Sequence, residues 1–164
     1  MERDNLFVPN KLAYAKGERP DVPCILCAAL AGDERVTGLV ATETERFGIL
    51  ANLYPYNPGH LMVVPKRHVE DVVDLDSEEV LELHDVQVQV MTLLRDLYTP
   101  SGFNVGYNIG ASSGASIPHL HLHIVPRHRS EQGFIDIIGG AKIIVEDPHV
   151  TMARFRDAWQ ARGR

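Results

Sequence analysis

Residues 118–127 read PHLHLHIVPR, with a histidine at every second position and an apolar residue between each pair. Because successive side chains of a β-strand point to opposite faces, this spacing predicts a strand with its histidines on one face. The apolar side chains then enter the core from the other face and fix the register, since a slip of one residue would exchange the two sets. The two sets are His119, His121 and His123 on one face and Leu120, Leu122 and Ile124 on the other.

Two chemistries use such a row of imidazoles. Neutral imidazoles are common zinc ligands, so the three histidines could together hold a catalytic metal. Alternatively, one imidazole is a nucleophile while its neighbours fix its tautomer and donate protons. The upstream loop GASSGASIP, residues 110–118, favours the second chemistry, because its small residues and hydroxyl groups can surround phosphate oxygens. The combination indicates attack on phosphorus.

The composition argues against several classes of protein. The 164 residues, 45% hydrophobic and 23% charged, suit a single globular domain. A formal net charge of −6 argues against nucleic acid or an acidic membrane as a partner, because both need a clustered basic surface. No stretch approaches the roughly 18 apolar residues of a membrane span, and the charged start MERDNLFVPN is unlike a signal peptide. Cys24 and Cys27 are too close together for a disulfide framework, so we expect a cytoplasmic protein.

Hydrophobic patterning predicts an α+β domain with a mainly antiparallel sheet. Residues 1–22 are expected to form an extended arm, followed by a short helix in CILCAALAG. Apolar and β-branched runs separated by turn residues predict the strands. These runs are TGLVATET (37–44), RFGILANL (46–53), HLMVVP (60–65) after the turn YPYNPG, GFNVGYNI (102–109), and FIDIIGGAKIIV (134–145) around a Gly-Gly turn. Strict alternation in GFNVGYNI predicts a half-buried strand.

Two longer helices are predicted from capping residues. Asp76 with Glu79 resembles a capping box, so a helix should begin there and run to about Tyr98. Its apolar stripe is expected at Val80, Leu83, Val90, Leu94 and Leu97. A C-terminal helix over 147–164 should have Asp147 as its cap and Pro148 in its first turn.

PHLHLHIVPR resembles the signature of the histidine triad (HIT) family, and other segments agree with this in order. NLYPYNPGHLMVVPKRH resembles the family's ribose segment with its supporting histidine, and GFNVGYNIGASSGASIPH resembles its phosphate strand and loop. The similarity runs from about Cys24 to Gly140, and is greatest to a bacterial branch with diadenosine tetraphosphate phosphorylases and fragile-histidine-triad-like proteins. The resemblance implies one HIT domain over 1–164, with an antiparallel sheet of five or more strands, a long central helix and a C-terminal helix.

The resemblance also implies a reaction. His121 would attack the α-phosphorus of a dinucleoside polyphosphate such as diadenosine tetraphosphate and form a covalent nucleotidyl-histidine, which water or inorganic phosphate then releases. His123 and His60 match the supporting histidines, and a protonated imidazole there would stabilise the developing charge. Asn108 matches an amide that contacts the phosphate or the leaving-group oxygen. These are the expected catalytic residues.

Further positions match the family's binding residues. Asn52 matches the residue that hydrogen-bonds the ribose, and Gly114 and Ser116 lie in the loop beside the α-phosphate. The expected partners are a small nucleotide and a second copy of the chain, because family members pair through their sheets and long helices. Neither Arg127 nor His128 receives a role from the resemblance.

The two cysteines have a separate implication. Cys24 and Cys27 have the spacing of a zinc-binding pair, but they supply only two of the four ligands that a structural site needs. Relatives complete this site with the histidine of a PKxH segment and the first triad histidine, which are His68 and His119 here. We therefore expect a structural zinc and no catalytic metal, although a divalent ion can accompany the polyphosphate substrate.

Three other functions remain open at this point. The same fold could hydrolyse nucleoside phosphoramidates, or the chain could bind and sense nucleotides with incidental turnover. A metallohydrolase that uses all three triad histidines for a catalytic zinc is the third.

Overall fold

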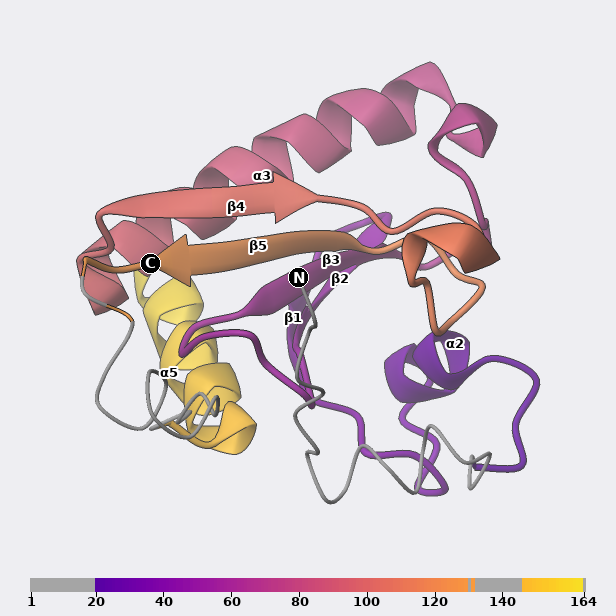
Figure 1. The fold of residues 1–164 in the computed structure, drawn as a ribbon, viewed down its shortest axis with the longest axis horizontal. Helices are drawn as coiled ribbons and strands as arrows, with labels where there is room; N and C mark the ends of the chain where they lie inside the picture. Colours follow the sequence, from indigo (N-terminus) through magenta and orange to yellow (C-terminus); the bar gives the residue numbers. More distant parts are fainter. Residues whose placement is uncertain (1–19, 130, 132–145, 164) are drawn as a thin grey trace, which may run out of the picture.

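The computed structural model describes residues 20–129, 131 and 146–163, which form an α+β fold (Figure 1). The elements in chain order are α2 (Ile25–Leu30), β1 (Val40–Glu43), β2 (Phe47–Ala51), β3 (Leu61–Pro65), the short 3-10 helix η1 (Val72–Asp74), α3 (Ser77–Tyr98), β4 (Gly102–Gly106), a second 3-10 helix η2 (Ala111–Ser113), β5 (Leu122–Arg127) and α5 (Pro148–Arg162). Residues 1–19 of the arm expected at 1–22, and the expected strands of FIDIIGGAKIIV, lie outside the described residues.

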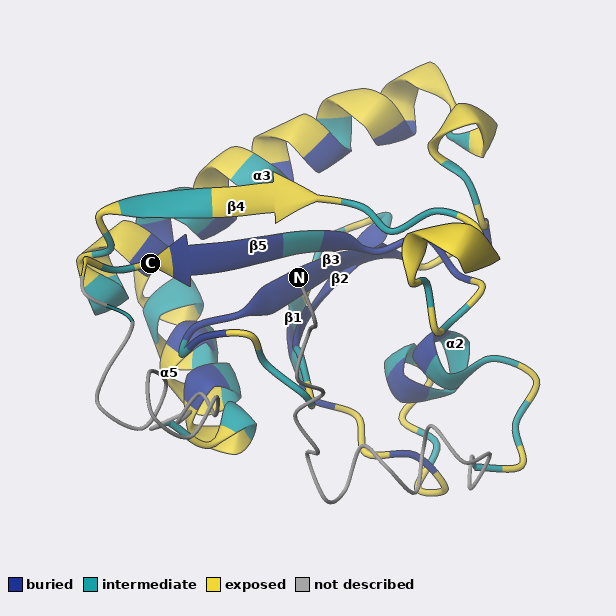
Figure 2. Cartoon of the chain, viewed as in Figure 1, coloured by how far each residue is buried: buried dark blue, intermediate teal, exposed yellow. Residues whose placement is uncertain are grey.

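The strands form one five-stranded antiparallel sheet in the order β1-β2-β3-β5-β4. This confirms the predicted α+β class and antiparallel sheet. The histidine strand β5 lies between β3 and β4, and Met62 of β3 is paired with His123. Figure 2 shows the inner strands as buried, whereas the far end of β4 is exposed.

Helices α3 and α5 cover one face of the sheet and enclose the main core. Its members include side chains from all three inner strands, among them Ile49, Val63 and Ile124, together with Val90 and Leu94 of α3. Helix α3 begins with the predicted capping box, in which Glu79 N–H donates to Asp76 and the Glu79 carboxylate accepts from Asp76 N–H.

One residue of the predicted α3 stripe was wrong. Val80 is 48% exposed, whereas Glu79, which the stripe omits, is only 5% exposed. The capping box turns Glu79 toward the body of the protein, and Arg67 forms an ion pair with its carboxylate at 2.7 Å. Val86 and Leu93 complete the buried face, together with Leu83, Val90 and Leu94.

The opposite face of the sheet is covered in part by α2. Leu26 and Ala29 of this helix pack against Leu50, Met62 and Val64 in a second, smaller core. Because side chains alternate along a strand, Met62 and Val64 point away from the main core that contains Val63. The functional residues lie on this second face.

Two predicted strands are shorter than expected. The strand in GFNVGYNI ends at Gly106, and its predicted inward residue Val105 is 38% exposed. Within the described sheet β4 is an edge strand, paired with β5 alone. Strand β5 begins at Leu122, which places His119 and His121 just before it. The alternation nevertheless holds, because Leu122 and Ile124 belong to the main core, whereas His123 is paired with Met62 of the second core.

Among the described residues, no helix combines the length and the apolar character that crossing a membrane would require.

Candidate functional site

A cavity of about 620 Å³ lies on the α2 face of the sheet, and the end of the histidine row lines it. This volume falls within the roughly 300–1,000 Å³ of small-molecule pockets. The polar part of its lining, termed the polar end, includes His121, His123, Asn108, Gly114 and Ser116. The apolar part of its lining, termed the apolar end, includes Leu26, Ala29, Val36, Leu39, Leu50 and Ile117, most of which belong to the second core or pack against it. The cavity can therefore hold a molecule with one polar and one apolar part.

The tautomer of His121 is set by a backbone carbonyl. His121 Nδ1 lies 2.6 Å from the carbonyl oxygen of His119, and this oxygen can only accept, so Nδ1 carries the proton. In the neutral ring Nε2 then has the free lone pair. The side chain is only 6% exposed and lines the cavity. His121 therefore offers an unprotonated ring nitrogen to a bound molecule.

His60 and His123 form a directed pair of hydrogen bonds. Tyr56 N–H donates to His60 Nδ1 at 3.0 Å, which leaves the proton of a neutral His60 on Nε2. That nitrogen lies 3.0 Å from His123 Nδ1 and donates to it. The proton of His123 is then on Nε2, a buried atom with no hydrogen-bond partner in the described part of the chain. A donor without a partner beside the cavity can bind a phosphate oxygen.

Burial keeps both supporting histidines neutral. It lowers the pKa of His60 to about 3, with His123 and His121 adding repulsion, and lowers the pKa of His123 to about 4, with His121 adding repulsion. The sequence suggested a protonated imidazole here, whereas in the free protein these rings act as neutral donors. Such histidines take up protons more readily in the unfolded chain, so their stability contribution is complete above about pH 6.5 and is lost as the pH falls toward these values.

We expect ¹⁵N spectra of the imidazoles at about pH 6 to show His60 and His123 as neutral Nε2–H tautomers, because burial lowers the pKa of both rings. The reason is the fixed order of donors from Tyr56 N–H through the two rings. His60→Asn and His123→Asn variants provide the assignments. Protonated rings, or Nδ1–H at His60, would contradict the described hydrogen-bond order.

Tyr56 is a site residue that the sequence analysis assigned only to a turn. Its ring stacks on His60 with centroids 4.8 Å apart, and it lines the cavity while remaining 50% exposed. Gly59 fixes this turn, because its φ of +77° favours glycine and a Cβ would lie 3.0 Å from the Tyr98 ring. The sequence signal that could have identified Tyr56 as a site residue is its aromatic side chain shortly before the supporting histidine, His60.

The other expected binding residues lie at the same cavity. Asn52, Asn108, Gly114 and Ser116 all line it, and Gly114 has a left-handed φ of +88° that allows the tight loop. Asn52 Oδ1 accepts from Tyr54 N–H at 2.9 Å, which orients its amide. His60 is buried behind His123 rather than in the lining.

Arg127 and His128 do not line the cavity. The Arg127 guanidinium forms an ion pair with Glu131 at 2.6 Å and donates to Asn104 at 2.7 Å. The backbone N–H of His128 donates to the same Glu131 carboxylate. Both residues therefore hold the end of β5.

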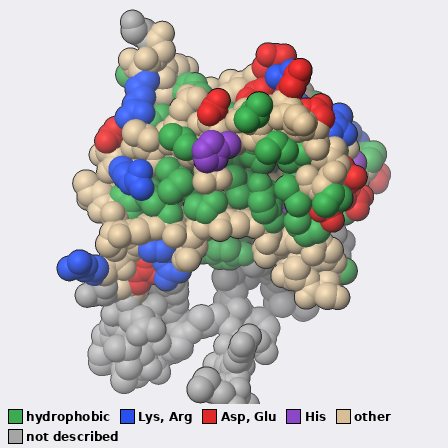
Figure 3. Space-filling view, turned by 90° about the horizontal axis from the view of Figure 1, so that it is seen from above, with side chains coloured by type: hydrophobic (Ala, Val, Ile, Leu, Met, Phe, Trp, Pro, Cys, Tyr) green, Lys and Arg blue, Asp and Glu red, His purple; other side chains and the backbone are tan. Residues whose placement is uncertain are grey.

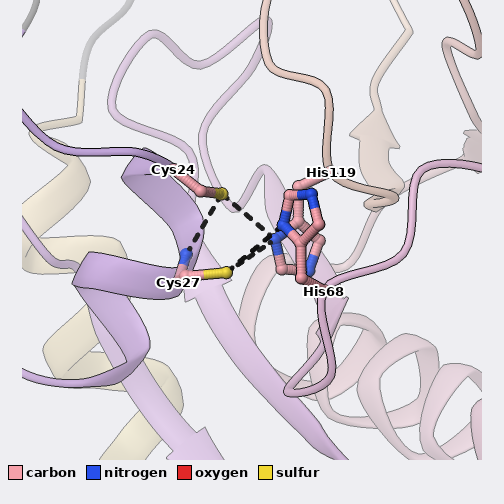
Figure 4. Close-up of side chains that lie close together, drawn as sticks. All are labelled: Cys24, Cys27, His68 and His119. Carbon is pink, nitrogen blue, oxygen red and sulfur yellow. Dashed lines mark hydrogen bonds between the residues drawn. The ribbon is translucent and has the colours of Figure 1, made fainter.

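The four predicted metal ligands converge at a second location. Cys24, Cys27, His68 and His119 place one ligand atom each within 4.8 Å of one another, and Figure 4 shows the sulfurs facing the imidazoles. His119 Nδ1 is 3.3 Å from Cys24 Sγ and 3.4 Å from Cys27 Sγ, and His68 Nδ1 is 3.4 Å from Cys27 Sγ. His119 Nε2–H donates to the Pro65 carbonyl, which leaves the Nδ1 lone pair directed at the sulfurs.

This cluster fits a tetrahedral metal ion. With ordinary zinc–sulfur and zinc–nitrogen bond lengths, an ideal tetrahedron separates sulfur from nitrogen by about 3.6 Å, close to the distances seen here. Burial and the neighbouring Cys24 raise the pKa of the Cys27 thiol to about 11, so this thiol opposes ionisation without a cation. The donor set is closed, so a bound ion would tie chain segments together and leave no position for a reacting water.

The fold is an antiparallel sheet with histidines on one face beside a partly apolar cavity, and a Cys₂His₂ cluster lies separately. These features define a class of small-molecule-binding α+β proteins. Within that class the chain belongs to the HIT domain family, whose family model matches residues 34–130.

Curated relatives and solved structures agree with this family. The chain is 46% identical over 108 residues to a protein named AP-4-A phosphorylase from Mycobacterium tuberculosis (strain CDC 1551 / Oshkosh), covering 65% of this chain and 55% of that protein. It is 30% identical over 96 residues to an asymmetrical bis(5′-nucleosyl)-tetraphosphatase from Schizosaccharomyces pombe, covering 58% of this chain and 53% of that protein. The chain thus spans about half the length of both relatives. A Zn-bound histidine triad family protein from Mycobacterium smegmatis superposes with a TM-score of 0.70 at 26% identity, covering 86% of this chain and 96% of that one.

Proposed function

We propose that the chain cleaves dinucleoside polyphosphates such as diadenosine tetraphosphate at the α-phosphate, with His121 as the nucleophile. The observation that carries this proposal is the hydrogen bond from His121 Nδ1 to the His119 carbonyl, which leaves an Nε2 lone pair at the polar end of the cavity. A neutral imidazole in this state needs no further base to attack phosphorus. The product of the first step is a nucleotidyl-histidine, and the leaving polyphosphate departs on the opposite side of the phosphorus.

The neighbouring residues have complementary roles in this proposal. His123 Nε2–H donates to an oxygen of the transferred or leaving phosphate, and His60 fixes the His123 tautomer. Asn108, Gly114 and Ser116 surround the phosphate, and the Asn52 amide binds the ribose. The apolar end then holds the base.

The names of the relatives support the substrate class and leave the second acceptor open. One relative is named as a phosphorylase and another as a tetraphosphatase, so either inorganic phosphate or water could release the nucleotide. Of the other candidate functions, the catalytic zinc site has the least support, because His119 faces the two sulfurs while His121 and His123 face the cavity. We assign the Cys₂His₂ cluster to a structural zinc. When bound, this ion would link chain segments together and take no part in the reaction.

The proposed activity is tested by product analysis with diadenosine tetraphosphate, with and without inorganic phosphate. ADP formed only with phosphate identifies a phosphorylase, and AMP with ATP formed in water identifies a hydrolase. Adenosine 5′-phosphoramidate is assayed in parallel. A clear preference for this compound would identify the chain as a phosphoramidate hydrolase and contradict the polyphosphate as its substrate. No turnover of either compound by zinc-loaded protein would contradict the proposal.

We further propose that two copies of the chain pair through β4 and α3. Strand β4 is an edge strand, so one side of its backbone has no partner within the described sheet. Leu81 and Val88 of α3 are 69% and 49% exposed, and they share a helix face by their spacing. Figure 3 shows hydrophobic side chains gathered around a histidine on this side of the molecule.

Replacing Leu81 or Val88 by glutamate is expected to convert a dimer into a monomer, because a charge would be buried at the interface. Light scattering after gel filtration measures the mass. Val150→Glu is the matched control, since Val150 is an exposed valine on α5. A wild-type monomer, or a dimer that survives both α3 substitutions, would refute this interface.

A further inference from the structure

Helix α2 forms a wall of the cavity and also carries part of the metal cluster. Ile25, Leu26 and Ala29 line the apolar end of the cavity. Cys24 is the N-cap of the same helix and Cys27 lies within it. The proposed nucleoside pocket and the Cys₂His₂ cluster therefore share one six-residue element.

A helix of this length is not stable by itself. Isolated helices shorter than about 12–15 residues are marginal in water, so α2 depends on its contacts. One set of contacts is apolar, where Leu26 and Ala29 pack on the sheet. The other is the cluster, in which Cys24 and Cys27 meet His68 and His119 from beyond β3 and just before β5.

The polar end of the cavity is anchored differently. His119 Nε2–H donates to the Pro65 carbonyl at 2.9 Å, and His121 Nδ1–H donates to the His119 carbonyl. His60, just before β3, forms a hydrogen bond with His123 of β5. These hydrogen bonds connect residues in or next to β3 and β5, and none of them involves α2.

We propose that the metal bound by Cys24, Cys27, His68 and His119 positions α2 as the wall of the nucleoside pocket, so that metal occupancy sets affinity for the nucleoside part of the ligand. This inference rests on the proposed function. Loss of the metal leaves α2 attached by its apolar contacts, whereas His119 is still held by its hydrogen bond to the Pro65 carbonyl and His121 by its hydrogen bond to His119. The cysteines and His68 thereby act as positioning residues for nucleoside recognition.

The expected size of the effect follows from the fraction of molecules with α2 in place. If α2 occupies its position one-tenth of the time without metal, the apparent Kd for a nucleotide rises about tenfold. An inorganic polyphosphate that contacts only the histidine end is expected to change by less than about twofold. Removal of the metal should therefore weaken the binding of a nucleotide much more than the binding of an inorganic polyphosphate.

The experiment measures AMP and inorganic pyrophosphate binding by calorimetry, with zinc-loaded protein and with the same protein after chelation. Hydrogen exchange of the amides of residues 25–30 is followed in both states. The expected results are about tenfold weaker AMP binding, nearly unchanged pyrophosphate binding and faster α2 exchange without zinc, all reversed on adding zinc back. Equal AMP affinity in both states, or equal loss of both ligands, would overturn the inference.

A variant that leaves all four ligands intact provides an independent check. Ala28→Gly lowers helix propensity in α2 at a position outside the cavity lining. It should weaken AMP binding more in the chelated protein than in the zinc-loaded protein, and the same loss in both states would overturn the inference. Zinc-loaded wild-type protein that binds no AMP would instead overturn the proposed function, and the inference with it.

Discussion

Replacing His121 by asparagine is expected to reduce kcat for diadenosine tetraphosphate by about six orders of magnitude, the scale seen when a catalytic nucleophile is removed. The reason is that asparagine offers no nitrogen lone pair at the position of Nε2, although it can retain the hydrogen bond to the His119 carbonyl. Folding should therefore be preserved. Steady-state kinetics, with AMP binding measured in parallel, distinguish lost chemistry from lost binding.

The matched control is His149→Asn. His149 is an exposed histidine at the start of α5, and it lies outside the cavity lining and the metal cluster. Its substitution should leave kcat unchanged. Activity of the His121→Asn protein within about tenfold of wild type would rule out a covalent mechanism through this residue.

Replacing both Cys24 and Cys27 by serine is expected to remove the bound zinc and lower the Tm by roughly 10 °C. A ligand present at about 1,000 times its Kd stabilises the native state by about 4 kcal/mol, and each kcal/mol is worth about 2–4 °C in a chain of this size. The effect arises because the cluster links α2 to the segment that follows β3 and to the segment that precedes β5. Elemental analysis and calorimetry measure the two quantities.

Two single-histidine variants show whether loss of zinc is specific to the cluster or follows the loss of any exposed histidine. His68→Ala should also lose zinc, whereas His149→Ala should keep it, since both side chains are exposed but only His68 belongs to the cluster. Zinc content equal to wild type in the double cysteine variant would refute the assigned ligands.

Local patterns in the sequence predicted much of this molecule. The alternation around His121, the capping box at Asp76 and the proline at the start of α5 each involve residues close in the chain, and the structure contains all three. The burial of Val80 was predicted wrongly because apolar spacing ignores the demands of the cap, which turns Glu79 inward instead.

Contacts between distant residues could not be derived in this way. The CxxC spacing supplied two ligands, but the approach of Cys24 to His119 spans 95 residues and entered only through the family resemblance. The proton order from Tyr56 through His60 to His123 depends on which nitrogen faces which partner, and spacing contains no such information. The edge position of β4 likewise depends on strand order rather than on its alternation.

The central claim is that His121 Nε2 forms a covalent bond to the α-phosphorus. Its most direct test is an alkaline quench of the reaction with diadenosine tetraphosphate, followed by mass spectrometry of the peptide that contains residues 118–127. The account predicts one added AMP on His121 during turnover, absent from the His121→Asn protein and discharged when the acceptor is supplied. Full turnover with no nucleotide on this peptide would contradict it.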